Sequence, residues 1–221
     1  RAKFVLPSLK LKHHYRSQHT DLIEFSNQHF YENELTIFPK QNAEKAIHHT
    51  YVNGRFIERK NEEEATAIVE LIESTIEKSN SLGVVAFSQN QIDLIRKKIN
   101  PTLLDRLIER EEAGTFFLLP LEKIQGDECE DLIIGTTYGP DEQGKIRQQF
   151  GLLSLDGGLN RLNVLATRAS KTIHLITSLK SNDIQMTTNP NTSKFGLWIN
   201  YITQKASAKG LSDKKDTICI P

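Results

Sequence analysis

Apolar residues recur along this chain in two alternating patterns, unbroken runs and helical repeats. Unbroken apolar runs between turn signals are typical of buried strands, and they occur at 82–87, 115–120, 131–138 and 172–178. Apolar residues three or four positions apart predict amphipathic helices, and they occur at 20–31, 61–76, 89–99, 158–169 and 193–206. Strands and helices therefore alternate along most of the chain.

The remaining stretches carry weaker patterns. Residues 9–14 alternate apolar and polar side chains, which suits a strand. We expect 36–60 to be irregular, with a short strand near Tyr51–Val52 before the Asn53–Gly54 turn signal. The stretch 139–157 is rich in Gly, Asp and Gln, which indicates a loop.

Alternation of apolar strands with helices favours the α/β class, with a mainly parallel central sheet flanked by helices. One helix start is marked by Asn61 and Glu64, whose spacing is that of a capping box. In such sheets ligands bind at loops beyond the carboxyl ends of the strands. We therefore expect the functional side chains in loops at that edge.

Three loops carry side chains suited to phosphate or nucleotide. Arg16 follows the strand predicted at 9–14, and its guanidinium offers a planar fork of donors to a phosphate. The segment 122–128 contains a glycine, which permits close approach of the backbone to a ligand. Arg161 and Arg168 are seven positions apart, which predicts that they share one helix face.

Each loop also has a purely structural interpretation: a surface arginine with an acidic partner, a polar turn, and a solvated charged face. A fourth segment, Gly139–Lys145, has the phosphate-loop spacing G-x-x-x-x-G-K. Ile146 follows it, however, where a Ser or Thr hydroxyl would bind Mg²⁺. We therefore do not expect that segment to hold a nucleotide.

The composition limits the kind of nucleic-acid contact. The 221 residues suffice for one large domain with its own core. Lys and Arg total 28, and Asp and Glu total 28, so the net charge is zero. Proteins that bind nucleic acid through bulk charge are usually strongly basic, so any contact here is local. No apolar run approaches the ~20 residues that span a bilayer, and we expect no membrane partner.

Cysteine and histidine positions argue against two other classes of site. Cys129 and Cys219 form no C-x-x-C pair, which suits a reducing, cytoplasmic compartment. The adjacent pairs His13–His14 and His48–His49 lack helical spacing and nearby cysteines, so we expect no metal site. The chain opens at Arg1 without a signal-peptide pattern, and we expect it to be part of a longer protein.

Four segments, taken together and in order, resemble the second RecA-like domain of superfamily 1 helicases. They are LKHHYRSQHTDLIEFSNQHFYENEL (motif IV), LGVVAFSQNQIDLI (the next strand and turn), LEKIQGDECEDLIIGTTYG (motif V) and LNRLNVLATRASKTIHLI (motif VI). The amino-acid sequences of these segments most resemble those of superfamily 1B, which includes the nonsense-mediated decay helicase, and those of large bacterial helicase-like proteins. The resemblance implies a RecA-like (P-loop NTPase-type) fold.

The resemblance also implies roles on the nucleotide side. Arg16 and Arg168 would be catalytic arginine fingers that reach the γ-phosphate of ATP. Gly126 and Glu128 would face the ribose, and Arg161 would contribute to the same cofactor-binding side. The N-terminal RecA-like domain of the same motor would bring ATP and Mg²⁺, so none is expected to bind tightly to this chain alone.

A second set of residues would contact the nucleic acid. Ser88, Gln91, Ile124 and Gln125 would lie along the single strand. Resemblance to the superfamily 1B branch implies translocation from 5′ to 3′. Resemblance of the motif sequences to bacterial helicase-like proteins favours DNA over RNA as the partner.

The chain departs from the family pattern where basic residues are common. Asn160, Ser170, Cys129 and Glu130 stand at such positions in motifs V and VI. These departures lower the positive charge near both motifs. They weaken the expectation of nucleic-acid binding more than that of nucleotide contact, because the motif arginines remain.

We expect residues 1–207 to form the motor domain and 208–221 to be a frayed polar tail. Two alternatives remain open. In one, the domain is a degenerate motor that acts as a docking scaffold for protein or nucleic acid. In the other, it is a self-contained nucleotide-binding domain that uses Gly139–Lys145.

Overall fold

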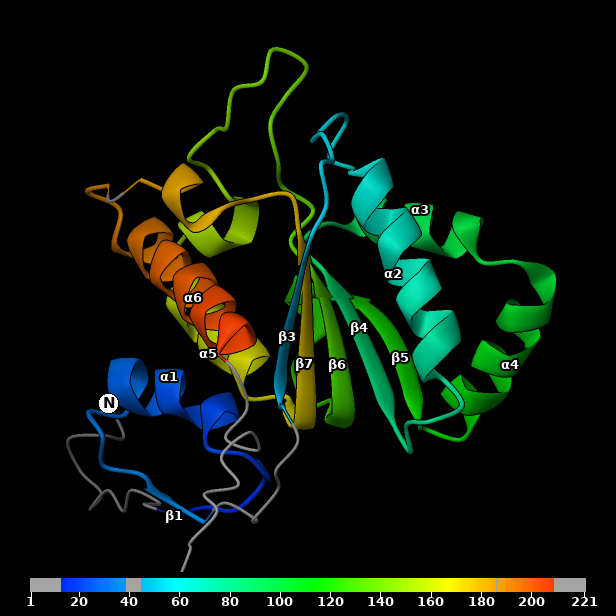
Figure 1. Cartoon of the computed structure of the whole chain (residues 1–221), viewed down its shortest axis with the longest axis horizontal. Helices are drawn as coiled ribbons and strands as arrows, with labels where there is room; N and C mark the ends of the chain where they lie inside the picture. The colour runs from blue at the N-terminus through cyan, green and yellow to red at the C-terminus, as the bar shows by residue number, and fades with distance from the viewer. Residues whose placement is uncertain (1–12, 39–44, 186, 209–221) are drawn as a thin grey trace, which may run out of the picture.

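Five parallel strands form the central sheet, in the order β3–β7–β6–β4–β5 (Figure 1). The computed structural model describes residues 13–38, 45–185 and 187–208. The strands are β3 (Ile47–Tyr51), β4 (Leu82–Ala86), β5 (Phe116–Pro120), β6 (Cys129–Gly135) and β7 (Ala169–Thr177). The expected α/β class with a parallel sheet is confirmed.

Helices cover both faces of the sheet, so the molecule has three layers (Figure 1). One face carries α1 (Asp21–Phe30), α5 (Gly158–Ala166) and α6 (Pro190–Ser207), and the other carries α2 (Glu62–Thr75), α3 (Gln89–Lys98) and α4 (Pro101–Glu112). Each face has its own apolar cluster. Trp198 and Phe195 of α6 are buried in the first, and Ile68 and Ile72 of α2 in the second.

The strands predicted from unbroken apolar runs are confirmed, because they lie where helices cover both faces. Every residue of β4 is buried, for example. The boundaries differ slightly: β6 begins at Cys129 and β7 at Ala169, both earlier than predicted. These early starts matter for the site, because they place motif residues next to the amino ends of two adjacent strands.

One strand of the sheet lies mostly where an irregular segment was expected, and only its last residue, Tyr51, falls in the short strand expected near Tyr51–Val52. β3 has the sequence IHHTY, and only Ile47 is buried in it. It forms the edge of the sheet, paired with β7 alone, so half-exposed polar side chains are tolerated. This polar pattern is why the prediction for 36–60 was wrong over most of β3.

The predicted strand at 9–14 is described only in part, because residues 1–12 lie outside the described residues. The described part, β1 (His13–His14), pairs with β2 (Thr36–Ile37) in a separate two-stranded sheet. The expectation that Arg16 follows a strand of the central sheet is therefore wrong. Of the predicted tail 208–221, only Ala208 is described, and the proposed domain limit stays a prediction.

The connection from β5 to β6 runs from the carboxyl edge of the sheet, where the strands end, back to the amino edge, where they begin. The two strands are parallel with β4 between them, so the segment 121–128 must return from the carboxyl end of β5 to the amino end of β6. A 3₁₀ turn, η2 (Leu121–Lys123), starts this return, and Leu121 and Ile124 are buried. The first part of motif V, up to Glu128, therefore reaches the amino edge of the sheet.

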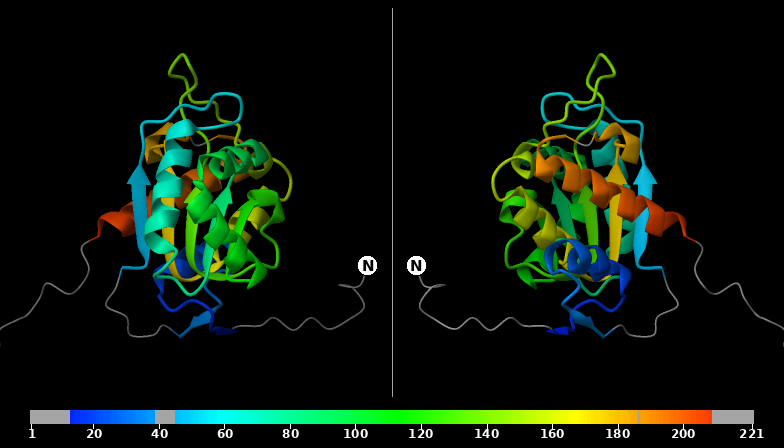
Figure 2. Two further views of the ribbon diagram at one scale, coloured as in Figure 1. Left: turned by 90° about the vertical axis from the view of Figure 1, so that its right-hand side faces the viewer. Right: turned by 90° about the vertical axis from the view of Figure 1, so that its left-hand side faces the viewer.

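The carboxyl edge is held by a buried glutamate. Asn61 caps α2 by accepting a hydrogen bond from the Glu64 N–H, as predicted. Glu64 does not complete the capping box; its carboxylate instead accepts hydrogen bonds from the N–H groups of Thr137 (2.6 Å) and Ser178 (2.8 Å) and from the Thr136 hydroxyl (3.0 Å). It thereby joins the ends of β6 and β7. The loops 52–60 and 139–150 project beyond this edge, and α1 lies near the opposite one (Figure 2).

Candidate nucleotide-facing site

Three residues that are far apart in the sequence meet at the amino edge of the sheet. Arg16 forms an ion pair with Glu128 and donates a hydrogen bond to the carbonyl oxygen of Thr167 at 3.2 Å. Glu128 directly precedes β6, and Arg168 directly precedes β7. The structure therefore brings together the two predicted arginine fingers and the predicted ribose-facing carboxylate.

Arg168 is fixed by backbone carbonyls. Its Nε donates to Val164 at 3.2 Å, and its Nη1 donates to Asp127 at 3.0 Å. Burial lowers the pKa of Arg168, and the nearby positive charge of Arg16 lowers it further. Two guanidinium groups therefore repel one another beside one directly paired carboxylate, Glu128, which is an arrangement that favours binding of an additional anion.

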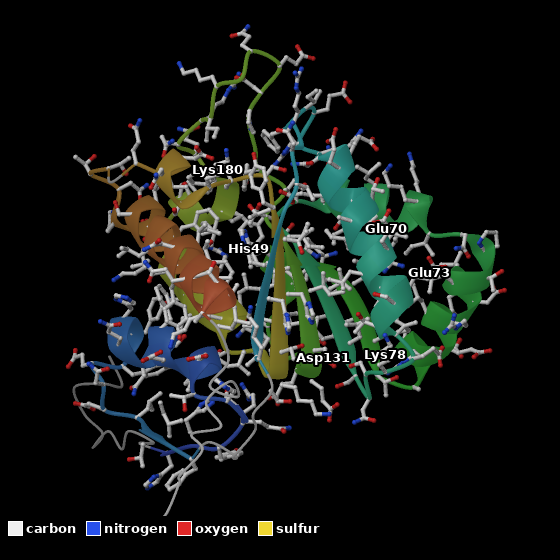
Figure 3. The ribbon with its side chains drawn as sticks, viewed as in Figure 1. His49, Glu70, Glu73, Lys78, Asp131 and Lys180 are labelled. Carbon is white, nitrogen blue, oxygen red and sulfur yellow. The ribbon has the colours of Figure 1, made fainter. Side chains whose placement is uncertain are left out.

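The edge on which this cluster lies differs from the expectation. A position at the carboxyl ends of the strands was expected, but the cluster is at the amino ends. The reason is local: 121–128 crosses to the far edge before Glu128, and α5 ends at Ala166, before Arg168. Figure 3 shows this edge by Asp131 of β6, whereas Lys180, just beyond β7, marks the carboxyl edge.

Main-chain hydrogen bonds hold the cluster in register. The N–H of Gln18 donates to the carbonyl of Ser170 at 2.8 Å, which ties the segment after Arg16 to the start of β7. The N–H of Cys129 donates to the carbonyl of Arg168 at 3.3 Å. The three motif segments thus form one backbone unit.

Gly126 lies two residues before Glu128, in a conformation that requires glycine. Its φ is +106°, and a Cβ placed there would have no neighbour within 4 Å. The turn is therefore glycine-dependent because of its backbone angle, and the space beside it is open. This openness agrees with the predicted close approach of a ligand, which stays a prediction.

Arg161 does not join the cluster. Its guanidinium donates to the carbonyl oxygens of Asp156 (3.1 Å) and Leu152 (3.5 Å), which precede α5. The helix face that Arg161 was expected to share with Arg168 does not exist, because α5 ends at Ala166. In this structure Arg161 secures the loop before the helix.

The residues predicted to follow a single strand are separated. Ser88 lies at the carboxyl edge, where it caps α3 and donates to the carbonyl of Arg59 at 2.7 Å. Gln91 is fully buried, and its amide both donates to and accepts from the backbone of Asn61. The side chain of Ile124 is buried in the core, whereas Gln125 is exposed. The burial of Gln91 and Ile124 therefore does not fit side-chain contact with a strand.

Sequence reasoning left one exposed aromatic residue without a role. The side chain of Tyr15 is 88% exposed, directly beside Arg16. An exposed aromatic ring next to a cationic cluster offers a stacking face for a base. The Tyr–Arg pair in the sequence was the available signal, although exposure itself was not.

The Gly139–Lys145 segment is not built as a phosphate loop. Its backbone donors at Gln143 and Lys145 point at the carboxylate of Asp141, at 3.1 and 2.9 Å. No helix follows directly, since the chain reaches α5 only after an irregular stretch and a 3₁₀ turn. Both observations agree with the expectation that this segment holds no nucleotide.

The described part of the chain contains neither a metal-binding group of side chains nor a membrane-spanning helix. Residues 13–38, 45–185 and 187–208 contain no group of three or more His, Cys, Asp or Glu side chains placed to hold a metal ion. In the same ranges, no helix has the length and apolar character needed to cross a bilayer.

Comparison with known proteins places these motifs in a family. A family model described as an AAA domain matches residues 3–180. The chain belongs to this AAA domain family. The match covers the cluster at the amino edge and all five strands of the sheet.

Relatives of this AAA domain include two curated proteins. They are the uncharacterized ATP-dependent helicase MG140 of Mycoplasma genitalium and its homolog in Mycoplasma pneumoniae, each 35% identical over 185 residues. The alignments cover 78% of this chain but only 16% of each relative. Among solved structures, the C-terminal domain of a possible DNA helicase from Lactobacillus plantarum is 14% identical, with a TM-score of 0.43, over 81% of this chain and 92% of that one.

Proposed function

We propose that this AAA domain is the second motor domain of an ATP-dependent helicase. The observation that carries the proposal is the convergence of Arg16, Glu128 and Arg168 at one edge of the sheet. The helicase names of the two Mycoplasma relatives support it.

The cluster fits an anionic phosphate rather than a metal ion. Arginine donors match phosphate oxygens, whereas Mg²⁺ takes oxygen ligands. The carboxylate that contacts the arginines, Glu128, is already paired with Arg16. Mg²⁺ and the triphosphate therefore belong to an N-terminal RecA-like domain, which lies against this edge when the motor closes.

The chemistry assigned to this chain is electrostatic. ATP with Mg²⁺ supplies the phosphoryl group that is transferred to water. Arg16 and Arg168 donate hydrogen bonds to oxygens on which negative charge develops, an effect worth ~10³–10⁵ in rate for an arginine finger. Their positions are preset by the carbonyls of Thr167, Val164 and Asp127, so little reorganisation is needed.

Glu128 and Tyr15 complete the nucleotide side. When a phosphate replaces Glu128 as the partner of Arg16, the freed carboxylate can accept a hydrogen bond from the ribose. The exposed ring of Tyr15 stacks on the base. Gly126 leaves the turn open for this approach.

The partner strand is single-stranded nucleic acid, with DNA favoured over RNA. Of the four residues first assigned to it, Ser88 and Gln125 keep accessible side chains. Opening and closing of the cleft during ATP turnover would move this strand past the domain.

The test is strand-stimulated ATP hydrolysis by the longer protein that contains this chain. Arg168→Ala should lower turnover by ~10³-fold and leave the KM for ATP nearly unchanged, because a finger arginine acts on charge that develops in the transition state. Arg96→Ala is the matched control, since Arg96 is a half-exposed arginine of α3 that pairs with Glu111. Near-normal turnover of a folded Arg168→Ala protein would contradict the proposal.

The docking-scaffold alternative has one observation in its favour. Glu128 already neutralises Arg16, so the cluster is stable without a nucleotide. A scaffold would keep its fold and partner binding in the Arg168→Ala variant and show no turnover in the unmodified protein. The same assay therefore separates the two functions.

A further inference from the structure

A cavity of about 730 Å³ lies at the carboxyl edge of the sheet, opposite the arginine cluster. Its walls come from the loops on either side, 52–60 and 138–155, which project together in Figure 2. The loops are joined by a hydrogen bond from the N–H of Phe56 to the carbonyl of Pro140 at 2.8 Å. Neither loop has a role in the nucleotide site.

Two aromatic rings form one wall of this cavity. Phe56 and Tyr138 have ring centroids 4.9 Å apart and tilted by 48°, and Tyr138 also packs edge-on against Phe150 at 5.3 Å. Both Phe56 and Tyr138 are only partly buried, so each retains accessible ring surface. Burial raises the pKa of Tyr138 to about 12, so its hydroxyl remains a hydrogen-bond donor.

Cationic side chains surround the aromatic wall. Arg59 and Lys145 line the cavity and are exposed, and neither forms an ion pair with another described residue. The positive charge of Arg59 acts on Tyr138, which places the guanidinium near the phenol ring. Arg147 is a third cation, 3.7 Å from Asp141. The wall therefore combines apolar ring faces with free positive charge.

The backbone around the cavity is held in unfavourable conformations. Glu58, Arg59 and Thr137 have φ angles of +50°, +65° and +68°, which cost non-glycine residues about 1–2 kcal/mol each. Asn90 of α3 donates a hydrogen bond to the carbonyl of Glu58 at 3.1 Å, and Ser88, which caps α3, donates one to the carbonyl of Arg59 at 2.7 Å. Strain of this kind persists only where the surroundings enforce it, and it concentrates at functional sites.

The positive φ of Thr137 is held in place by the buried carboxyl group of Glu64. The N–H of Thr137 donates to Glu64 at 2.6 Å, and its hydroxyl accepts from the N–H of Phe87 at 3.1 Å. These contacts turn the chain at the end of β6 and orient Tyr138 at the cavity. The aromatic wall is therefore set before any ligand arrives.

We propose that this cavity binds single-stranded nucleic acid and takes an unstacked base against Phe56 and Tyr138. Arg59 and Lys145 then contact the flanking phosphates. Aromatic faces combined with mobile cations are the chemistry by which proteins hold single strands without reading sequence. The inference rests on the proposed helicase function, but its residues are separate from the nucleotide cluster.

The alternative occupant, a mononucleotide, fits less well. A phosphate cradle needs free backbone N–H groups, and those of Gln143 and Lys145 are used by Asp141. A strand needs only ring faces and side-chain cations, which the cavity provides. Because the chain has zero net charge, strand contact requires a local concentration of cations, and Arg59, Lys145 and Arg147 provide one at this cavity.

The test is binding of a fluorescently labelled oligothymidine to this chain, followed by fluorescence anisotropy at several salt concentrations. Phe56→Ala should raise the Kd about tenfold, within the range for loss of one base–aromatic stack. Arg59→Ala should raise the Kd several-fold and lower the salt slope by about one, as for loss of one phosphate contact.

Matched controls come from the same loop. Arg55→Ala and Ile57→Ala change exposed neighbours that do not line the cavity, and each should bind within about twofold of the unmodified chain. An oligonucleotide with abasic positions provides a second readout. If a base enters the cavity, the Phe56→Ala effect should disappear on the abasic strand, while the Arg59→Ala effect should persist.

Three outcomes would overturn the inference. Unchanged strand binding by both Phe56→Ala and Arg59→Ala would show that the strand binds elsewhere and would leave the helicase proposal intact. If ATP displaces the labelled strand from the unmodified chain but not from the Phe56→Ala variant, the cavity is a mononucleotide site. No strand binding at low salt would exclude the cavity site, whereas the Arg168→Ala turnover assay would still decide the motor function independently.

Discussion

Two adjacent glycines open α5 for different reasons. Gly157 has a φ of +77°, so it is required by its backbone angle. A Cβ on Gly158 would lie 2.0 Å from the carbonyl oxygen of Leu153, so Gly158 is required by the close approach of another backbone segment. The sequence showed where the helix begins, but not that contact.

This difference gives a prediction at the residue scale. Gly158→Ala should lower the free energy of unfolding by about 3 kcal/mol, because the Leu153 backbone cannot move aside cheaply. Gly144→Ala should cost about 1 kcal/mol, since Gly144 has a positive φ of +77° but open space around it. Urea denaturation of both variants measures the two costs. Equal losses would contradict the steric argument.

Side-chain chemistry could be predicted from the sequence where it is carried by the motif residues. Arg16, Glu128 and Arg168 were singled out without coordinates, and the structure places them together. Burial could not be predicted in the same way. Gln91 and Glu64 are polar residues at helix starts, and only the packing of α2 and α3 shows that both are fully buried.

At the scale of elements, the apolar runs were informative because most apolar residues of four strands, β4, β5, β6 and β7, are buried in the core. The helix α4 was not predicted, and the edge strand β3 was predicted only at its end, where the short strand expected near Tyr51–Val52 overlaps it at Tyr51. For β3 the polar sequence concealed the strand. For α4 the signals were present: Asn100 caps the helix by accepting from the Leu103 N–H at 2.9 Å, and Pro101 occupies its first turn.

The cap of α4 can be tested directly. Asn100→Ala should lower the free energy of unfolding by about 1 kcal/mol, because the Leu103 N–H loses its acceptor. Thr102→Ala, at an exposed first-turn position, is the control and should change stability by less than about 0.5 kcal/mol. Thermal or urea unfolding followed by circular dichroism gives both values. Strand-stimulated ATP hydrolysis should not change in either variant.

At the scale of the whole molecule, buried Glu64 and partly buried His174 contribute to the pH dependence of stability in opposite directions. Burial raises the pKa of Glu64 from 4.5 to about 8, and burial with the neighbouring His48 lowers the pKa of His174 from 6.5 to about 4. Folded Glu64 holds its proton more tightly than unfolded Glu64, so stability falls as pH rises from 4.5 toward 8. His174 acts in the opposite direction, and its contribution is lost as pH falls below 6.5.

Between pH 6.5 and 8 the Glu64 effect should dominate. The free energy of unfolding should fall there with a slope that approaches about 1.4 kcal/mol per pH unit, the limit for one proton. Glu64→Gln should remove this slope, although it also lowers stability at every pH because one backbone donor loses its acceptor. Glu63→Gln, an exposed neighbour, should keep the slope. If the slope is unchanged in Glu64→Gln, a titrating group other than Glu64 causes the pH dependence of the free energy of unfolding.

The chain by itself should not hydrolyse ATP. The carboxylate that contacts the arginine cluster, Glu128, is already paired with Arg16, and the G-x-x-x-x-G-K segment directs its donors at its own Asp141. Phosphate release by the pure chain should equal the rate without protein. Release that is abolished by Lys145→Ala would revive the self-contained nucleotide-binding alternative.

The arginine cluster also imposes an order on how the site comes into being. Arg16 contacts Glu128 and Thr167, which lie 112 and 151 positions further along the chain. Bringing such distant segments together costs loop-closure entropy, which is recovered only when the strands between them have paired. During synthesis from the N-terminus, the pairing of Arg16 therefore waits until β7 has left the ribosome. A chain that stops before Thr167 carries three of the four helicase-like segments in full, but it lacks Arg168 and with it the proposed phosphate site.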